Sequence, residues 1–312
     1  MRRAPFLPRL EKLSPIGQAL IWSLFGTVTG GLMNVLIRAA AAELDPIEIV
    51  FFRNFFALVV MVPFILRLGP GALRTSKMGF YTLRAVVAFL SMITWFIGIT
   101  IVPLATATAL NFTAPLFATI LAAMVLGEQV RVRRWSAIAM GFIGVIVILR
   151  PFGPLDLAML VLLFSAATAA MGSITVKFLS RSEPAVAIVS YMVIYLTPIS
   201  LVPALFVWQW PSLATTGYLL LLGLCGVLSH FGVTRALAAA DASAIAPFEF
   251  LRLPYAALLG FIFFTERPDA WTWIGAAIIV GSSLYVAHRE AKLARRNPAK
   301  VSGGRPQPVP PG

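Results

Sequence analysis

Residues 104–126 read LATATALNFTAPLFATILAAMVL, an apolar stretch without a single charged side chain. As a helix it rises about 35 Å, at ~1.5 Å per residue, and crosses the ~30 Å hydrocarbon core of a bilayer. In lipid only helices and closed barrels satisfy their own backbone hydrogen bonds, and the stretch lacks the alternation of barrel strands. Ten such helices are predicted, at Ile16–Ile37, Ile47–Leu66, Gly79–Ile101, Leu104–Leu126, Trp135–Leu149, Leu155–Val176, Ala185–Val207, Gly217–Thr234, Ala242–Phe264 and Trp271–Ala287.

The composition points to the same class, an all-α integral membrane protein. Of the 312 residues 59% are hydrophobic and 12% are charged, whereas soluble domains carry about 25% charged residues. Cys225 is the only cysteine, which excludes a disulfide scaffold. The net charge of +13 does not predict a nucleic-acid partner, because the basic residues lie between apolar segments. The lipid bilayer is the predicted environment, and no motif predicts a metal or a cofactor.

The distribution of basic residues predicts the orientation. With ten crossings, only Arg38, Arg150 and Arg267 fall on one side, and Arg53 and Arg252 fall within spans. The other 20 of the 25 Lys and Arg residues lie on the side that holds both termini. Cytoplasmic loops are enriched in Lys and Arg. Both termini are therefore predicted to be cytoplasmic, in a bacterial inner membrane.

The ends of the chain are predicted to be tails. Residues 1–15 form a cytoplasmic leader, and residues 288–312, basic and then rich in Pro and Gly, form a disordered cytoplasmic tail. The apolar core of a signal peptide has about 7–15 residues. Ile16–Ile37 is longer and contains Thr27, Thr29 and Asn34, so the first span is predicted to stay in the membrane.

The chain contains an internal repeat. A shift of 138 to 140 positions aligns Arg38 with Lys177, Pro63 with Pro203, Pro115 with Pro254, Glu128 with Glu266 and Trp135 with Trp273. The predicted units are residues 16–150 and 151–287. Each unit holds five spans, and an odd number makes the second unit enter the membrane from the opposite side. Such an inverted repeat is typical of carriers that expose one site to each side in turn.

The repeat allows two other interpretations. Duplication could merely build a larger stable bundle. An enzyme is disfavoured because the chain has no H-E-x-x-H motif, nucleophile elbow, close pair of membrane aspartates or phosphate-binding P-loop. A carrier is therefore the predicted class.

The fourth predicted span carries a family resemblance. The stretch from Pro103 to Phe117, continued by Leu126-Gly127-Glu128, resembles the fourth helix of the EamA-type drug/metabolite transporter superfamily. Ala242–Phe264, followed by Thr265-Glu266, resembles the equivalent helix of the second repeat, with Thr265 where Gly127 stands in the first. The resemblance covers residues from about 16 to 287. It implies a basket of ten helices around a central cavity, as in bacterial exporters of aromatic and other amino acids.

Charged residues inside the ninth predicted span are candidate site residues, because a charge in hydrocarbon needs a partner or a water-filled cavity. Glu249 and Arg252 are three residues apart and share one helix face. Arg252 is predicted to anchor a substrate carboxylate, and Glu249 to contact an amine or to couple transport to protons. The alternative is a structural ion pair. His230 is predicted at a depth similar to that of Glu249.

The repeat and the uncharged polar groups extend this site. Asn111 and Thr113 occupy positions equivalent to those near Glu249 and Arg252, and Pro115 and Pro254 are predicted to break both helices beside the site. Thr108 is a candidate hydrogen-bonding group.

Two further side chains within the predicted spans have predicted roles. Trp95 is predicted to line the cavity. Arg53 is predicted to have a structural role, reaching outward to Asp45 or Glu48, with contact to the substrate as the alternative.

The predicted function is alternating-access transport of a small organic metabolite by a monomer without a cofactor. The leading hypothesis is an exporter of aromatic or neutral amino acids. The alternative is an uptake transporter for a cofactor-like metabolite such as S-adenosylmethionine or riboflavin. Coupling to protons through Glu249 is left open.

Overall fold

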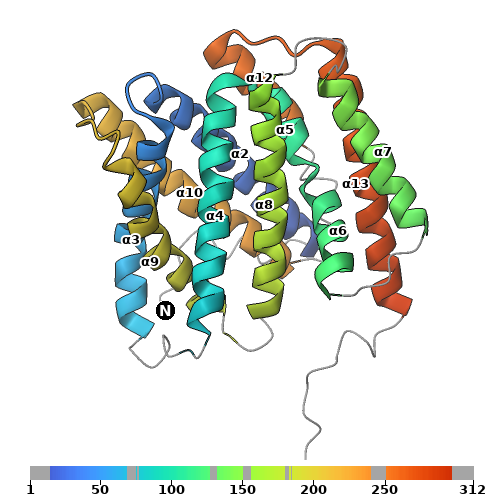
Figure 1. Ribbon diagram of the computed structural model, residues 1–312, viewed down its shortest axis with the longest axis horizontal. Coiled ribbons are helices and arrows are strands. Elements are labelled where there is room, and N and C mark those ends of the chain that lie inside the picture. The colour runs from blue at the N-terminus through green and yellow to red at the C-terminus, as the bar shows by residue number, and fades with distance from the viewer. Residues whose placement is uncertain are drawn as a thin grey trace, which may run out of the picture.

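The chain forms a bundle of α-helices. The computed structural model describes residues 15–68, 75, 77–126, 132–149, 156–179, 183, 185–239 and 251–296, and every regular element in these ranges is helical (Figure 1). The helices are α2 (Pro15–Ala40), α3 (Pro46–Leu68), α4 (Met78–Ile101), α5 (Leu104–Asn111), α6 (Ala114–Leu126), α7 (Val132–Leu149), α8 (Leu157–Leu179), α9 (Ala185–Ala204), α10 (Leu213–Ala239), α12 (Arg252–Phe264) and α13 (Ala270–Arg296). The prediction of an all-α protein is confirmed.

Six helical segments are long and apolar enough to cross a membrane: Gly17–Ala40, Pro46–Pro63, Met78–Ile101, Leu104–Leu121, Leu157–Val176 and Leu213–Val233. Four shorter apolar helices occupy the places of the other predicted spans: Trp135–Leu149, Ser190–Ala204, Arg252–Phe264 and Ala270–Ser282. The chain is therefore a membrane protein with several crossings, and the total of ten crossings stays a prediction.

Several predicted boundaries differ from the structure. The span at 104–126 is two helices, α5 and α6, interrupted at Phe112 and Thr113 just before Pro115. Helix α10 extends beyond the predicted span at both ends, and α13 continues past Ala287 to Arg296. Residues 288–296 are thus helical rather than part of a tail, because a helix that leaves the membrane loses its apolar character without losing its backbone hydrogen bonds.

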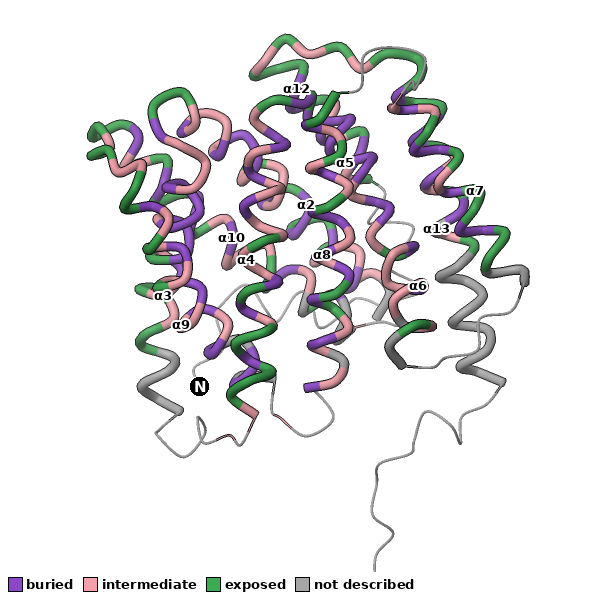
Figure 2. The backbone as a smooth tube through the Cα atoms, viewed as in Figure 1, coloured by how far each residue is buried: buried purple, intermediate pink, exposed green. Residues whose placement is uncertain are grey.

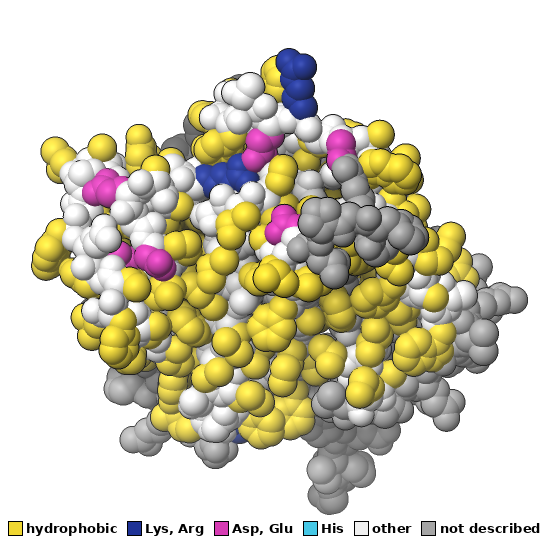
Figure 3. Space-filling view, turned by 45° about the horizontal axis from the view of Figure 1, so that its top comes forward, with side chains coloured by type: hydrophobic (Ala, Val, Ile, Leu, Met, Phe, Trp, Pro, Cys, Tyr) yellow, Lys and Arg dark blue, Asp and Glu magenta, His cyan; other side chains and the backbone are white. Residues whose placement is uncertain are grey.

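The outside of the bundle is apolar. Large hydrophobic side chains such as Val28, Val59, Ile143 and Phe164 are exposed on helices around the bundle, and exposed stretches follow the outer helices in Figure 2. In Figure 3 a broad hydrophobic surface lies below the acidic side chains that gather toward the top. Soluble monomers rarely expose apolar patches of this extent, so lipid is the natural contact for this surface.

The main contacts between helices join the two halves of the chain. The halves α2–α7 and α8–α13 pack chiefly on each other: α2 on α10, α4 on α8, α3 on α9 and α7 on α13. Exchanging each helix for its counterpart in the other half turns the α2–α10 pair into the α8–α4 pair and leaves the other two pairs unchanged. Figure 1 shows the α3–α9 pair and the α7–α13 pair at opposite ends of the bundle. The packing therefore has the approximate two-fold symmetry of the predicted repeat.

The two halves point in opposite directions. Arg38, near the end of α2, donates a hydrogen bond to the carbonyl of Ile99, near the end of α4. Gly98, also near the end of α4, lies against Leu162, near the beginning of α8. Helix α2 therefore ends at the face where its counterpart α8 begins, as an inverted repeat requires. We call this face, which holds Arg38, the outer face.

Acidic side chains join the halves at both faces. At the outer face, Glu43 in the α2–α3 loop accepts hydrogen bonds from Thr215 and from Ser212 Oγ (2.8 Å) at the start of α10. At the opposite face, Glu183 in the α8–α9 loop accepts hydrogen bonds from Thr75 Oγ1 and Tyr81 Oη, both at 3.1 Å. In each case the loop of one half holds the start of a helix of the other. We call these the two loop contacts.

Glycines allow the closest approach between halves. A Cβ atom placed on Gly275 of α13 would lie 2.6 Å from the carbonyl oxygen of Gly144 in α7 and 2.5 Å from Ile148 Cγ1. The backbone atom cannot move aside as a side chain could. Gly275→Ala should therefore separate α7 from α13 and destabilise the protein by roughly 1–3 kcal/mol, as measured by thermal unfolding in detergent. Gly281→Ala in the same helix is the control, because nothing lies within 4 Å of the added methyl group; equal losses in both variants would contradict the close packing.

The outer loop contact predicts a pH dependence. The hydroxyl of Thr215, followed by the backbone and hydroxyl of Ser212, lowers the pKa of Glu43 below its usual 4.5. A carboxylate whose pKa is lower in the folded state stabilises the protein above its unfolded pKa and loses this effect as the pH falls through the folded pKa. Thermal unfolding measured from pH 7 downward should show this loss below about pH 4.5, and Glu43→Gln should lack that component. Parallel pH profiles for the two proteins would contradict the assignment.

Candidate functional site

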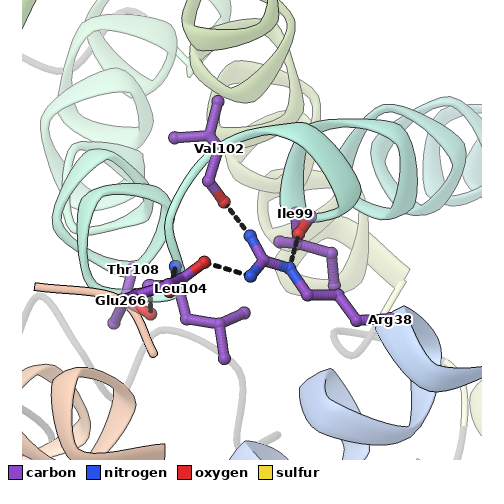
Figure 4. Close-up of polar contacts among 6 residues, drawn as sticks. All are labelled: Arg38, Ile99, Val102, Leu104, Thr108 and Glu266. Atoms are coloured by element: carbon purple, nitrogen blue, oxygen red, sulfur yellow. Dashed lines mark hydrogen bonds and ion pairs between the residues drawn. The ribbon is translucent and has the colours of Figure 1, made fainter. Parts of the chain in front are cut away.

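Arg38 is the centre of a polar network at the outer face (Figure 4). Its guanidinium donates hydrogen bonds to the backbone carbonyls of Ile99 and Val102 and forms an ion pair with Glu266. Its Cζ also lies 4.9 Å from the centre of the Phe264 ring, a cation–π arrangement. Ile99 and Val102 stand at the end of α4, where the chain leaves the helix and leaves carbonyls without helical partners. Arg38 satisfies two of them.

Glu266 completes the network from the other half of the chain. Its second oxygen accepts the backbone N–H of Leu104, the first residue of α5, at 2.8 Å. Thr265, at the end of α12, has a φ of 57°, in the left-handed region that non-glycine residues seldom adopt. This turn aims Glu266 back over α12, where a Cβ on Gly260 would lie 2.5 Å from its Oε2. Thr265 therefore adopts, where the first repeat has Gly127, a conformation that favours glycine.

The network joins α2, α4 and α5 of the first half to the end of α12 in the second. The side chains of Arg38 and Glu266 are only 9% and 15% exposed. We call Arg38, Glu266 and their backbone partners the outer clasp. It ties helix ends of the two halves together at the outer face.

Basic side chains within helices of the bundle include Arg53, Arg84, His230 and Arg252. Arg53 is buried, whereas the side chain of His230 is exposed. Helices α3, α4, α10 and α12 each contribute one of these four residues.

Arg53 is buried, with 7% of its surface exposed. Its Nη1 donates to Asn54 Oδ1 at 3.0 Å, and the guanidinium lies against α10, where a Cβ on Gly226 would be 3.2 Å from Nη2. Gly226 is one helical turn before His230, on the same face of α10. The predicted outward bond to Asp45 or Glu48 is wrong, because Arg53 turns toward α10 instead.

Arg84 lies in the first turns of α4 and crosses to the second half. Its Nη1 donates to the carbonyl of Gly172 in α8 at 2.9 Å, and its Nη2 approaches Met192 Sδ in α9 at 3.4 Å. Its Nε is buried without a hydrogen-bond partner. Trp95 is eleven residues further along the same face of α4, and its Nε1 donates to Asn34 Oδ1 of α2 at 3.4 Å.

Two of the site residues predicted near the helix break, Thr108 and Thr113, form hydrogen bonds with nearby backbone carbonyls. Thr108 Oγ1 donates to the carbonyl of Leu104 at 2.7 Å, and Thr113 Oγ1 donates to that of Leu110 at 2.6 Å. Thr108 is 5% exposed and Thr113 is fully buried, so in this conformation both hydroxyls serve their own helix. Asn111, the last residue of α5, is partly exposed, and Pro115 is exposed.

The second predicted break lies partly outside the described residues. Glu249 falls in the range 240–250, which the structure does not describe, so its pairing with Arg252 or His230 stays a prediction. Arg252 is the first residue of α12. Pro254 lies in the first turn of this helix, where its missing N–H removes no helical hydrogen bond.

A family model for the EamA-like transporter family matches residues 17–150 and again residues 156–287. The chain belongs to the EamA-like transporter family. The two matches coincide with the two halves whose opposite orientation is described above.

The named relatives of this chain are transporters, not enzymes. The S-adenosylmethionine uptake transporter of Rickettsia prowazekii is 34% identical over 88% of this chain and 93% of its own length. The riboflavin transporter of Rhizobium johnstonii is 33% identical over 88% of this chain and 93% of its own. A pseudopaline exporter of Pseudomonas aeruginosa is 27% identical over 86% and 95%.

A solved crystal structure shares the EamA fold seen here. It superimposes with a TM-score of 0.59 and covers 87% of this chain and 98% of its own, at 15% sequence identity. Identity this low shows a likeness of fold alone.

Two features of this EamA family chain were missed from the sequence. Arg38 was used only to predict the orientation in the membrane. The repeat aligns Arg38 with Lys177 and Glu266 with Glu128, so a residue of the same charge recurs at each position. Arg84 was assigned to the cytoplasmic side, although it lies within the predicted span Gly79–Ile101. Its position inside an apolar segment was the available signal.

The outer clasp predicts strong energetic coupling. Removing one partner of a buried ion pair leaves the other charge buried alone and costs about 3–5 kcal/mol. Arg38→Met and Glu266→Gln should each destabilise the protein to this extent in unfolding experiments in detergent, and the double variant Arg38→Met/Glu266→Gln should lose less than the sum. The exposed Arg267→Gln is the control, with little expected change. Additive losses would contradict the coupling.

Proposed function

We propose that this chain is an inner-membrane carrier for uptake of a cofactor-like metabolite, with S-adenosylmethionine as the leading substrate. The supporting observation is the set of S-adenosylmethionine uptake transporters from four Rickettsia species, which are 32–34% identical over 87–88% of this chain. This hypothesis replaces the export of aromatic or neutral amino acids, which the family resemblance implied.

The interior side chains suit the functional groups of such a molecule. S-adenosylmethionine combines a planar purine with an amino acid headgroup. In our proposal Arg252 binds the carboxylate, Glu249 binds the amine, and the half-buried ring of Trp95 lies along the purine. His230 lines the space between them. Asn111, Thr108 and Thr113 contribute only if the break between α5 and α6 rearranges.

Transport requires the two ends of the bundle to open in turn. We assign the outer face to the side opposite the two cytoplasmic termini, consistent with the distribution of Lys and Arg. The outer clasp then closes the entry side in this conformation. Uptake requires Arg38 and Glu266 to separate, so that the substrate reaches His230 from outside, and to rejoin before release. Ten crossings in a single chain contain the whole site, so a monomer is sufficient.

A second candidate substrate is riboflavin. Riboflavin transporters of Rhizobium johnstonii, Vibrio cholerae and Brucella anthropi are 32–33% identical over 84–89% of this chain. The flavin ring is also planar and suits Trp95, whereas riboflavin has no carboxylate for Arg252.

Transport by the purified full chain in proteoliposomes separates these hypotheses. Radiolabelled S-adenosylmethionine should enter in a saturable manner, and unlabelled S-adenosylmethionine inside should accelerate its entry by exchange. Labelled riboflavin and phenylalanine are tested in parallel, with protein-free liposomes as the control. Transport of phenylalanine without S-adenosylmethionine would overturn the proposal in favour of the amino acid carrier, and transport of riboflavin alone would support the second candidate.

A further inference from the structure

Positive charge exceeds negative charge inside the bundle. Away from their ends, the predicted spans contain Arg53, Arg84 and Arg252 but only one acidic residue, Glu249; Glu48 and Asp156 are each the second residue of a predicted span. The excess exists whatever Glu249 contacts, because it can neutralise only one arginine.

Glu48 does not neutralise the arginines. It lies in the first turn of α3, where its Oε1 accepts the backbone N–H of Gln209 at 2.9 Å and its Oε2 is buried without a partner. Arg53 is about one and a half turns deeper along α3 and directs its Nη1 to Asn54. The acid and the base on this helix are therefore not paired.

The described partners of Arg53 and Arg84 are neutral. Arg53 bonds an amide oxygen, and Arg84 bonds a backbone carbonyl and approaches a thioether. These groups orient the two guanidinium groups but do not cancel their charge. A charge within a membrane bundle is costly unless it is paired or faces a water-filled space. Arg53 lies against α10 one helical turn before His230, whose side chain is exposed.

We propose that Arg53 and Arg84, together with Arg252, form an oxyanion-binding region inside the bundle, and that the transported molecule therefore carries a carboxylate or phosphate group. The guanidinium fork matches both groups and forms charge-assisted hydrogen bonds with them. Arg53 reaches this region from the first half along Gly226, and Arg84 links it to the second half through Gly172. The inference rests on the proposed carrier function and narrows its substrates to organic anions and zwitterions.

Matched ligand pairs test the inference on the wild-type chain in detergent. The pairs are S-adenosylmethionine with its decarboxylated analogue and riboflavin 5′-phosphate with riboflavin, measured by calorimetric titration. Charge-assisted hydrogen bonds predict that the oxyanionic member of a bound pair binds about ten- to hundred-fold more tightly. Equal binding of both members would overturn the inference even if S-adenosylmethionine is transported.

Inorganic phosphate and acetate provide a test that is independent of the proposed substrates. At least one of them should raise the melting temperature of the wild-type chain, and the better of the two shows whether the region prefers phosphate or carboxylate. Stabilisation by either ion without binding of any adenosyl or flavin compound would support the oxyanion region while disproving the proposed cofactor uptake. If neither ion nor any oxyanionic ligand has an effect, the inference is wrong.

Variants connect the effect to the two arginines. Arg53→Gln and Arg84→Gln should each weaken binding of the oxyanionic ligand at least about ten-fold, with little change for its neutral partner. Arg53→Lys keeps the charge but loses the fork and should fall in between. Arg267→Gln removes an exposed arginine outside the region and should bind as the wild type does. If Arg53→Gln does not fold, Arg84→Gln and the ligand pairs on the wild-type chain still test the oxyanion-binding region. Equal weakening of both members of a pair would favour a purely structural role.

Discussion

Charged groups inside a membrane bundle must find their partners within the protein, because hydrocarbon offers none. Arg38 meets this constraint fully, with two backbone carbonyls and Glu266 around its guanidinium. Arg53 and Arg84 meet it only in part, since their described contacts orient the charge without neutralising it. The same constraint therefore separates a group that ties the two halves together from groups available to a charged ligand.

Much of the fold could be predicted from hydropathy and the internal repeat, because lipid selects apolar helices of sufficient length. Hydropathy did not predict where a helix ends once it continues beyond its apolar segment. Helix α13 continues to Arg296 through residues such as Glu290 and Lys292, which favour helix but not lipid. The break between α5 and α6 was expected from Pro115, whose ring cannot continue the preceding hydrogen-bond ladder.

The candidate site was harder to predict than the fold. The sequence shows that Arg84 lies in an apolar segment, but its contact with Gly172 depends on how α4 is rotated and which helix packs there. The repeat aligned Arg38 with Lys177 and Glu266 with Glu128, yet it could not show that Arg38 and Glu266 meet across 228 positions. The residues were visible, whereas their pairing is a property of the packed bundle.

The two loop contacts, Glu43 with the start of α10 and Glu183 with the start of α4, are related by exchange of the halves. Contacts that occur twice across an approximate two-fold axis are those of a symmetric dimer. An ancestral five-helix chain, inserted into the membrane in both orientations, would have made each of them between separate molecules.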